Sequence, residues 1–487
     1  MELDPQRLFS PARHASGWPR MPTVLGEAMV ATSHPLATRA GVRALEAGGN
    51  AVDAALAAAA VLTVAEPGHN GPGGDAFALL WWNGALQGLN GSGRSAADLP
   101  ERTVARFGPR SVTVPGAVRA WADLAGRFGR LGLDAALAPA IDAGERGIAA
   151  TARVAEHWRL AGIRAPWPAP RAGERYRLPE LAQTLRLVAE SGPDGFYAGT
   201  VARAIAEASL LAESDLAAHR SEWVEPLRLA YRGLEVCELP PNGQGAAALL
   251  GLALAEERDD LHGQVEAMKV ALARARESIH DGPLPDDFLE VEPLAERATE
   301  APSFAPGGDT NYLCCVDGDR NAISLIQSTY EHFGSGILAG DTGVVLQNRG
   351  ACFTAAEGHP NRIAPGKRPF HTIVPGLLLK DGALLGPFGI MGGHMQAQAH
   401  AQVVRRIADD DDPQAALDGA RFRVDGGRAV VLEPGLAGEA DGLRSLGHEV
   451  EVAADQHGFG VGQAILRLGD SLVGGSDGRG DGHAAGF

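Results

Sequence analysis

Thr310 is the residue whose surroundings most suggest covalent chemistry. It follows a flexible Gly-Gly-Asp sequence at 307–309 and opens an apolar run at 311–316 that is typical of a β-strand. A second apolar run at 322–328 lies beyond a polar turn, so the two runs predict a hairpin with Thr310 at the mouth of its first strand. A threonine hydroxyl can serve as a nucleophile when a base accepts its proton. A turn with a capping hydroxyl is the simpler interpretation of the same residues.

Further motifs stand in a defined order on both sides of this hairpin, from residue 22 to residue 482. In this order and spacing they resemble the gamma-glutamyltranspeptidase family, and the resemblance covers nearly the whole chain. The motifs are Ser-His-Pro-Leu-Ala at 33–37, Gly-Gly-Asn-Ala-Val-Asp at 48–53, Glu-Pro at 66–67, Gly-Pro-Gly-Gly at 71–74, Val-Pro-Gly at 114–116, Phe-Gly-Ser-Gly at 333–336, Leu-Gln-Asn at 346–348 and Pro-Gly-Lys-Arg-Pro at 365–369.

The resemblance implies a four-layer αββα fold (α/β, α+β) of the N-terminal-nucleophile hydrolases. It implies a precursor that cuts itself between Asp309 and Thr310 into a large subunit, 1–309, and a small subunit, 310–487, which together form one domain. The new α-amino group, with a reference pKa of about 7.7 to 8.0, would then activate the neighbouring hydroxyl. The implied product is a heterodimer without a cofactor, and the pairing of two heterodimers into a heterotetramer is left open.

Two more features match the implied catalytic machinery. Gly392 and Gly393 lie between a predicted strand and a predicted helix at 396–407, where backbone N–H groups are well placed to hold a developing negative charge. A tight strand-to-helix turn is compatible with the same residues. Ser328 retains a hydroxyl at a position where the family uses one near its nucleophile.

The positions that read a γ-glutamyl group do not match the family. The arginine that grips the substrate carboxylate in the transpeptidases is replaced here by Ser92, although Arg94 lies two residues further on and could reach a carboxylate. The carboxylate that holds the substrate's α-ammonium is replaced by Cys352. The remaining candidate substrate-binding residues, at positions where the family has an asparagine and paired serines, are Tyr330, His371 and Thr372.

This pattern favours an amidohydrolase that acts through an acyl-enzyme on Thr310. The sequence is most similar to the oxamate amidohydrolase and cephalosporin-acylase-like branch, which implies a small, acidic, oxamate-like amide, with Arg94 and His371 as its donors. One alternative is a gamma-glutamyl hydrolase or transpeptidase acting on glutathione-like substrates. Another is a non-cleaving homologue with a binding role.

Composition limits the remaining classes. The formal net charge of -17 argues against a nucleic acid or an anionic membrane as partner, because both require basic patches. Apolar stretches are too short for a membrane span, and the polar segment 1–20 lacks the apolar core of an export signal, so we expect a cytoplasmic protein. Four scattered cysteines favour buried thiols over disulfides, and neither His371 nor His394 belongs to a recognised zinc motif, so no metal is predicted.

Helices and strands can also be placed. We expect two helices within 36–66, the second buried on every face, and Asp53 near the start of that helix. A strand is expected at 76–82 after the glycine-rich loop, which would shape the floor of the site or serve as a plain turn. Mostly helix is expected at 118–231, and an exposed charged loop at 257–306.

Overall fold

The computed structural model describes residues 20–99, 103–303 and 308–487. Gly307, in the approach to Thr310, and the N-terminal segment 1–19, on which the expected localisation rests, lie outside these ranges. No helix within the described ranges is long and apolar enough to cross a membrane.

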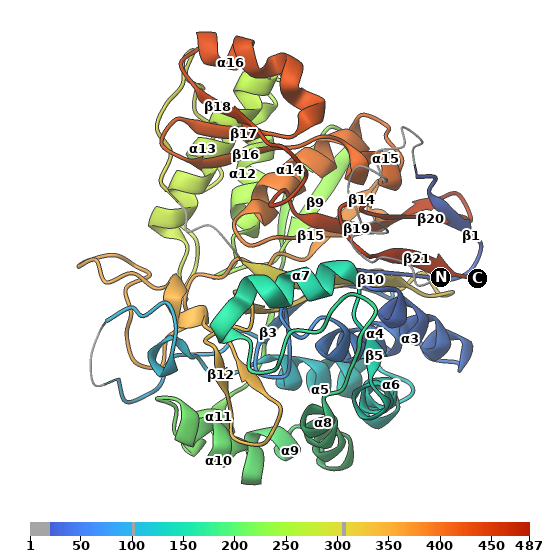
Figure 1. The fold of residues 1–487 in the computed structure, drawn as a ribbon. Helices are drawn as coiled ribbons and strands as arrows, with labels where there is room; N and C mark the ends of the chain where they lie inside the picture. Colours follow the sequence, from blue (N-terminus) through green and yellow to red (C-terminus); the bar gives the residue numbers. More distant parts are fainter. Residues whose placement is uncertain (1–19, 100–102, 304–307) are drawn as a thin grey trace, which may run out of the picture.

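Two antiparallel seven-stranded sheets form the centre of the molecule (Figure 1). The first, here called the nucleophile sheet, contains the predicted hairpin, whose two strands pair with each other and are flanked by strands from the first third of the chain. Its strands, in spatial order, are β21 (His483–Gly486), β2 (Met29–Thr32), β10 (Asp309–Val316), β11 (Ala322–Tyr330), β3 (Asp75–Trp82), β4 (Ala85–Asn90) and β7 (Glu222–Val224).

The second sheet packs face to face against the first. Both sheets take strands from either side of the predicted cleavage point. The order of the second sheet is β1 (Thr23–Leu25), β20 (Ser471–Ser476), β19 (Val461–Leu468), β15 (Ala383–Met391), β14 (Gly376–Lys380), β9 (Leu234–Glu238) and β8 (Leu227–Tyr231).

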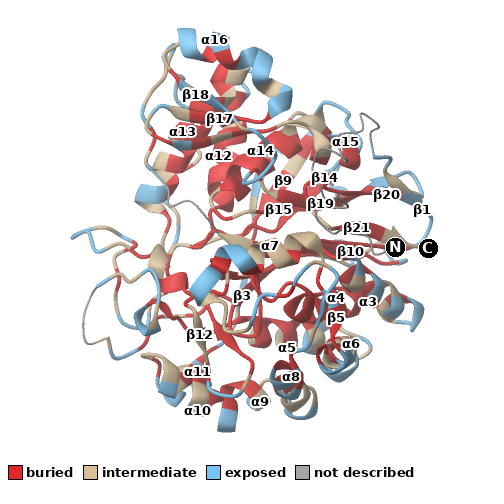
Figure 2. Ribbon diagram, in the orientation of Figure 1, coloured by how far each residue is buried: buried red, intermediate tan, exposed pale blue. Residues whose placement is uncertain are grey.

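Helices cover both outer faces, which completes the predicted αββα sandwich (Figures 1 and 2). On the nucleophile sheet lie α3 (Pro35–Glu46), α4 (Ala51–Ala65), α5 (Ala117–Phe128), α6 (Leu133–Arg146) and α8 (Pro179–Ser191), and on the second sheet lie α12 (Gly245–Ala255) and α14 (Met395–Ala408). The other elements are α7 (Ala152–Ala161), α9 (Asp194–Tyr197), α10 (Gly199–Ala208), α11 (Glu213–Ala218), α13 (Leu261–Ser278), α15 (Pro413–Asp418), α16 (Ala440–Ser445), β5 (Ile148–Ala149), β6 (Arg175–Tyr176), β12 (Ile337–Leu338), β13 (Val345–Leu346), β16 (Phe422–Gly426), β17 (Ala429–Leu432) and β18 (Glu449–Val452).

The side chains of β10 alternate between two apolar layers, as a pleated strand requires. Tyr312 and Cys314 enter the layer between the sheets, whereas Leu313 and Cys315 face the helices. All four cysteines of the chain are free thiols, as expected. The nucleophile strand is therefore fixed by packing on both faces.

Helix α4 is buried on every side, as its all-small composition predicts. Asn50 caps its N-terminus and Asp53 returns a hydrogen bond to the Asn50 backbone, which forms a reciprocal capping box. The predicted structural role of Asp53 is thus confirmed. The helix packs directly on β10 and β11 and so supports the nucleophile strand from behind.

One expectation was wrong. The region 257–306 is not an extended exposed loop, because α13 occupies 261–278 and buries Glu266 and Lys269 as an ion pair with 2.9 Å between the charged atoms. The charge of this segment suggested solvent, but pairing allows charged side chains to be buried. The region 118–231 is mostly helical, as expected, and ends in two strands, β7 and β8.

Candidate active site

Thr310 lines a pocket of about 560 Å³ at the ends of central strands of the two sheets, where β10, β15 and β19 contribute Thr310, Met391 and Val461. The walls come from distant segments, including the strand-to-helix turn at Gly392, the helix α7 and the loop that precedes β19. Besides Thr310 and Gly392, the lining includes the polar residues His69, Arg153, His157, Asp309, His332, His457 and Arg479.

A β-bulge sets the position of Thr310. Asp309 pairs with Tyr330, but the next pair along the hairpin is Asn311 with Gln327, so the register shifts at Thr310. Bulges re-aim side chains and are common beside active sites. The extra residue of the bulge lies on β11, and Tyr330, which follows it on that strand, has φ of +81°, a strained value for a bulky residue.

A chain of hydroxyl groups joins the side chain of Thr310 to the peptide bond before it. The Thr310 hydroxyl donates to Ser328 Oγ at 3.3 Å, and the Ser328 hydroxyl donates to the Asp309 carbonyl at 2.5 Å. The Tyr330 N–H holds Ser328 Oγ in place at 2.8 Å. The candidate nucleophile, a proton acceptor and the carbonyl at the predicted cleavage point therefore form one connected group.

Gln396, at the start of α14, fixes Thr310 from the other side. Its amide nitrogen donates to Thr310 Oγ1 at 3.2 Å, while its amide oxygen accepts from the Val374 N–H at 3.0 Å. The second contact defines which end of the amide is the donor. The sequence analysis missed Gln396, although its place three residues after the glycine pair was a usable signal.

The glycine pair adjoins the nucleophile, and only Gly392 is part of the pocket lining. Gly392 and Gly393 have φ of +139° and +58°, values that favour glycine. A methyl group on Gly308 would meet the Gly393 Cα at 2.6 Å, so the uncut chain crosses directly over the pair. The Gly393 carbonyl accepts from Gln244 at 2.9 Å, which fixes the peptide plane.

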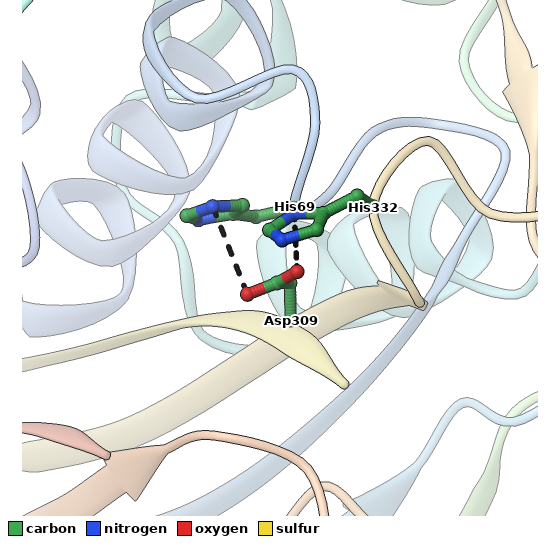
Figure 3. Close-up of side chains that lie close together, drawn as sticks. All are labelled: His69, Asp309 and His332. Atoms are coloured by element: carbon green, nitrogen blue, oxygen red, sulfur yellow. Dashed lines mark ion pairs between the residues drawn. The ribbon is translucent and has the colours of Figure 1, made fainter. Parts of the chain in front are cut away.

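His69 and His332 lie beside Asp309 next to the same peptide bond (Figure 3), and a third histidine, His157, adjoins them. Asp309 makes a close ion pair with His332, and His69 Nε2 lies 3.9 Å from its other oxygen. His157 Nδ1 lies 2.6 Å from His69 Nε2. Burial lowers the pKa of His69 to about 3, whereas Asp309 raises the pKa of His332 against the opposing effect of burial.

The Asp75 carboxylate is hydrogen-bonded to residues in or beside several of the family-like motifs. Burial raises its pKa to about 6, and its carboxylate accepts hydrogen bonds from the Gly93 and Gly116 N–H groups and from the Gln347 side chain. The fourth partner is the His371 ring, whose Nε2 lies 3.1 Å away. His371 is fully buried and does not line the pocket, so the structure places it in this supporting hub.

A second hub forms around Asn311, the residue after the candidate nucleophile. Its amide nitrogen donates to Ser33 Oγ at 2.8 Å and to the Glu66 carboxylate, and its oxygen accepts from Asn70. The Ser33 hydroxyl also donates to Glu66 at 2.5 Å. Motifs at 33–37 and 66–67 therefore meet beneath the nucleophile strand.

The other predicted substrate-binding residues lie outside the pocket lining. Arg94 forms ion pairs with Asp281 at 2.5 Å and with Glu222 at 3.1 Å. Ser92 is buried and donates to Asn90 at 2.7 Å. Arg94 thus has its charge compensated within the protein.

Tyr330 and Thr372 instead surround a buried arginine that the sequence analysis missed. Arg349 donates to Thr372 Oγ1 at 2.9 Å, lies over the Tyr330 ring at 4.4 Å and reaches Ser328 Oγ at 3.5 Å. Cys352, which replaces the carboxylate of the transpeptidases, lies 3.8 Å from the same guanidinium. This places a buried cation directly behind the hydroxyl chain.

Arg153 is the cation of the pocket that lacks a partner. It projects from α7 and lines the cavity, and within residues 20–99, 103–303 and 308–487 it makes no hydrogen bond or ion pair. Arg479 lines the same cavity but is fully paired, with Glu433 at 2.5 Å and Asp477 at 3.0 Å. No local motif marks Arg153 in the sequence.

An αββα sandwich with a strand-leading threonine beside a glycine pair defines an N-terminal-nucleophile hydrolase fold. The family model of gamma-glutamyltranspeptidase matches residues 37–487. The chain therefore belongs to the gamma-glutamyltranspeptidase family, as its motifs indicate, and it belongs to a family of hydrolytic enzymes.

Relatives agree over almost the full length. The glutathione hydrolase-like YwrD proenzyme of Bacillus subtilis (strain 168) is 36% identical, over 94% of this chain and 98% of that protein. The oxamate amidohydrolase proenzyme of Klebsiella pneumoniae is 34% identical over the same shares. Among solved structures, cephalosporin acylase from Bacillus halodurans has a TM-score of 0.92 and 40% identity, over 98% of this chain and 99% of that one.

Proposed function

We propose that this protein is a self-cleaving amidohydrolase that hydrolyses a C–N amide bond of a small acidic substrate through an acyl-enzyme on Thr310. The observation that carries the proposal is the hydroxyl chain from Thr310 through Ser328 to the Asp309 carbonyl. In the uncut chain these contacts would allow Thr310 to act as the nucleophile, Ser328 as the proton relay and the Asp309 carbonyl as the group attacked. The precursor names of the relatives support the same reading.

In self-cleavage, Thr310 Oγ attacks the Asp309 carbonyl carbon and passes its proton toward Ser328. The Ser328 hydroxyl donates to the carbonyl oxygen as charge develops there, and the buried Arg349 cation favours the same charge. The C–N bond then breaks, and the amine nitrogen of Thr310 takes up the proton. Water hydrolyses the resulting ester, which releases the new carboxylate of Asp309 and restores the threonine hydroxyl.

In turnover, the freed α-amine of Thr310 accepts the hydroxyl proton and later donates it to the leaving amine. The backbone N–H groups of the turn at Gly392 and Gly393 supply the oxyanion donors once the segment before Thr310 no longer covers them. Water then attacks the acyl ester on Thr310 and releases the acid. The products of turnover are the acid and an amine or ammonia, and the enzyme is restored.

Arg153 supports an acidic acyl group as the substrate class. An unpaired guanidinium in a pocket attracts a carboxylate and can bind it with two hydrogen bonds. This assigns the carboxylate to Arg153 rather than to Arg94, whose charge is already compensated. Oxamate and other short amides with a terminal carboxylate would supply the negative charge that Arg153 lacks, and a pocket of about 560 Å³ has room for them.

Intact-protein mass spectrometry tests the first step. The wild type should yield two fragments that begin at residues 1 and 310, and Thr310→Ala should remain a single chain. The matched control is Thr329→Ala, which removes another buried threonine hydroxyl from β11 and should leave cleavage unchanged. A single uncut wild-type chain, or cleavage elsewhere, would contradict the proposal.

The cleaved protein is then assayed on a panel of amides with ammonia or amine release as the readout. We expect turnover of oxamate or a glutaryl-type amide, and none after Thr310→Ala. Preferential release from a γ-glutamyl anilide would instead support the glutathione hydrolase alternative. Cleavage without turnover of any amide would limit the assignment to a self-processing protein.

A further inference from the structure

The histidine cluster beside Asp309 has the composition of a metal site. His69, Asp309 and His332 each direct one ligand atom toward a common point, and these three atoms lie within 4.8 Å of one another (Figure 3). Two imidazole nitrogens and one carboxylate oxygen are a donor set that binds Zn²⁺ and similar divalent ions. The proposed amidohydrolase mechanism uses none of these side chains as a base or a nucleophile.

We propose that His69, His332 and the Asp309 side chain bind a divalent transition-metal ion of the Zn²⁺ type in the uncut chain. Zinc requires ligand atoms about 2.0 to 2.2 Å from the ion. His69 Nε2 and Asp309 Oδ1 are 3.9 Å apart, so both can reach one ion with small side-chain shifts. His332 already contacts the other Asp309 oxygen.

The surroundings of His69 suit a ligand. It is 3% exposed, and among the described residues its Nδ1 has no hydrogen-bond partner. That nitrogen lies 3.9 Å from the Glu66 carboxylate, which could accept its proton and orient the ring, as carboxylates do behind metal-bound histidines.

His157 lies beside these three ligands. Its Nδ1 lies 2.6 Å from the His69 nitrogen that faces Asp309, so it borders the same point. A second histidine cluster in the molecule, around His262, lacks this character because Lys269 donates toward His448 at 3.3 Å and pairs with Glu266. The Lys269 ammonium group therefore takes the place that a metal ion would need in that cluster.

The site is special in containing the residue at the predicted cleavage point. A metal ion there would tie Asp309 to His69 and His332, which belong to the fixed body of the fold. Three protein ligands would leave a position open toward the pocket. The experiment therefore uses the full-length Thr310→Ala chain, in which Asp309 stays in place whether or not the wild type cleaves itself.

Isothermal titration with ZnCl₂ is the first measurement. We expect one ion per chain, and the His69→Gln/His332→Gln variant should bind at least about tenfold more weakly, because even outer partners of metal ligands cost about 10- to 100-fold. The matched control His457→Gln changes another histidine of the pocket wall and should leave affinity unchanged. Absence of binding, or equal binding by the double variant, would overturn the proposal.

A second measurement needs no histidine variant. Diethylpyrocarbonate labelling of the same chain, followed by peptide mass spectrometry, should show protection of His69 and His332 by Zn²⁺ and no protection of His457. Equal labelling with and without the ion would overturn the assignment. Because Thr310 is absent from this chain, neither result depends on amidohydrolase activity.

Discussion

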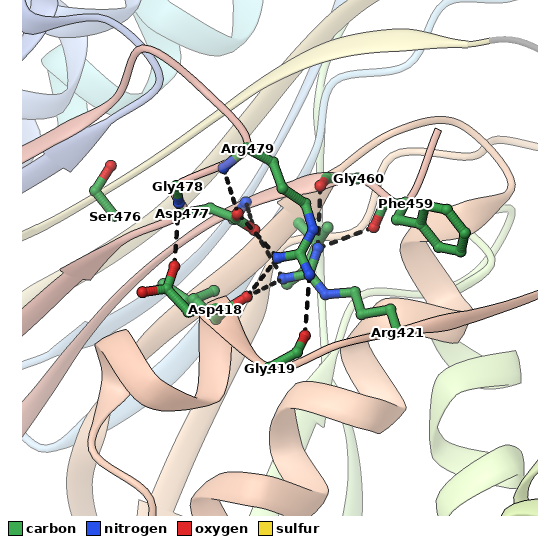
Figure 4. A network of polar contacts seen from close by, with 12 residues as sticks. Asp418, Gly419, Arg421, Phe459, Gly460, Ser476, Asp477, Gly478 and Arg479 are labelled. Atoms are coloured by element: carbon green, nitrogen blue, oxygen red, sulfur yellow. Dashed lines mark hydrogen bonds and ion pairs between the residues drawn. The ribbon is translucent and has the colours of Figure 1, made fainter. Parts of the chain in front are cut away.

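Arg479 and Arg153 line the same pocket in opposite electrostatic situations. Arg479 is almost fully buried, and all three of its guanidinium nitrogens donate to carboxylates or carbonyls (Figure 4). It shares Asp477 with Arg421, whose guanidinium donates at 2.7 Å. Arg153 is half-buried and, among the described residues, has no partner. The charge of Arg479 is therefore compensated within the protein, whereas the charge of Arg153 is available to a ligand.

The network of Arg421 and Arg479 differs in the same way from the surroundings of Thr310. The network of Arg421 and Arg479 joins the loop before β16 to the C-terminal strands and has little capacity left for a ligand. The Thr310 side contains a bulge, a strained Tyr330 and His69, whose Nδ1 has no hydrogen-bond partner among the described residues. Saturated charges hold the fold together, and unsaturated groups are available for chemistry.

The largest expected effect on stability comes from removing an arginine from the buried network of Arg421 and Arg479. Arg479→Met leaves Glu433 and Asp477 without a major cation in a buried site, so the free energy of unfolding should fall by about 3 to 5 kcal/mol. Urea denaturation followed by circular dichroism measures this change. Arg153→Met should change stability by no more than about 0.5 kcal/mol. Equal losses of unfolding free energy in both variants would contradict the contrast between Arg479 and Arg153.

Removing the Ser328 hydroxyl should affect the rate of self-cleavage. In Ser328→Ala the Asp309 carbonyl loses its donor, so cleavage should slow by about 100- to 1000-fold, as for loss of one oxyanion donor. A time course of fragment appearance on gels gives the rate. Ser324→Ala is the matched control on β11, because that hydroxyl bonds to Tyr312 and lies away from the peptide bond. Rates that fall alike in both variants would point to general destabilisation.

Arg153→Met should weaken the use of acidic substrates. Loss of a charge-assisted contact of about 1.5 to 3 kcal/mol corresponds to a fall in kcat/KM of about 10- to 150-fold. Self-cleavage should remain at the wild-type rate. Arg159→Met provides the control, since Arg159 is exposed on the same helix and outside the pocket lining. An unchanged kcat/KM for Arg153→Met would show that Arg153 does not bind the substrate.

Acidification should destabilise the histidine side of the pocket by a smaller amount. Burial lowers the folded-state pKa of His69 to about 3 and of His157 to about 4, against about 6.5 in the unfolded chain. Below about pH 6.5 the unfolded chain therefore binds protons that the folded chain does not, and the free energy of unfolding falls with pH. Each group contributes at most about 1.4 kcal/mol per pH unit.

Urea midpoints measured at pH 7 and pH 5 test this linkage. His157→Gln should show a smaller loss between the two values than the wild type. His457→Gln, whose side chain is 49% exposed, should retain the wild-type dependence. A wild-type midpoint that is equal at both values would show that these histidines take up protons in the folded state.

Local sequence predicted the elements that carry their own signals. The hairpin at Thr310, the glycine turn before α14 and the buried helix α4 each follow from a short pattern of residues, and the structure confirms these elements. The proposed catalytic roles of Thr310, Ser328, Gly392 and Gly393 stay predictions. Arg94 and His371 show the limit of such patterns, because a suitable residue type in a suitable loop says nothing about its partners in space.

The family, the layered fold and the position of the candidate nucleophile follow from the residue order alone, because they depend on motifs that are contiguous in the chain. The compensation of each charge depends on the folded molecule. Arg94 meets Asp281 from 187 residues away, and Arg479 meets Glu433, whereas Arg153 meets no carboxylate among the described residues. Pairing depends on distance in space, and distance in space is set by the packing of the whole sandwich.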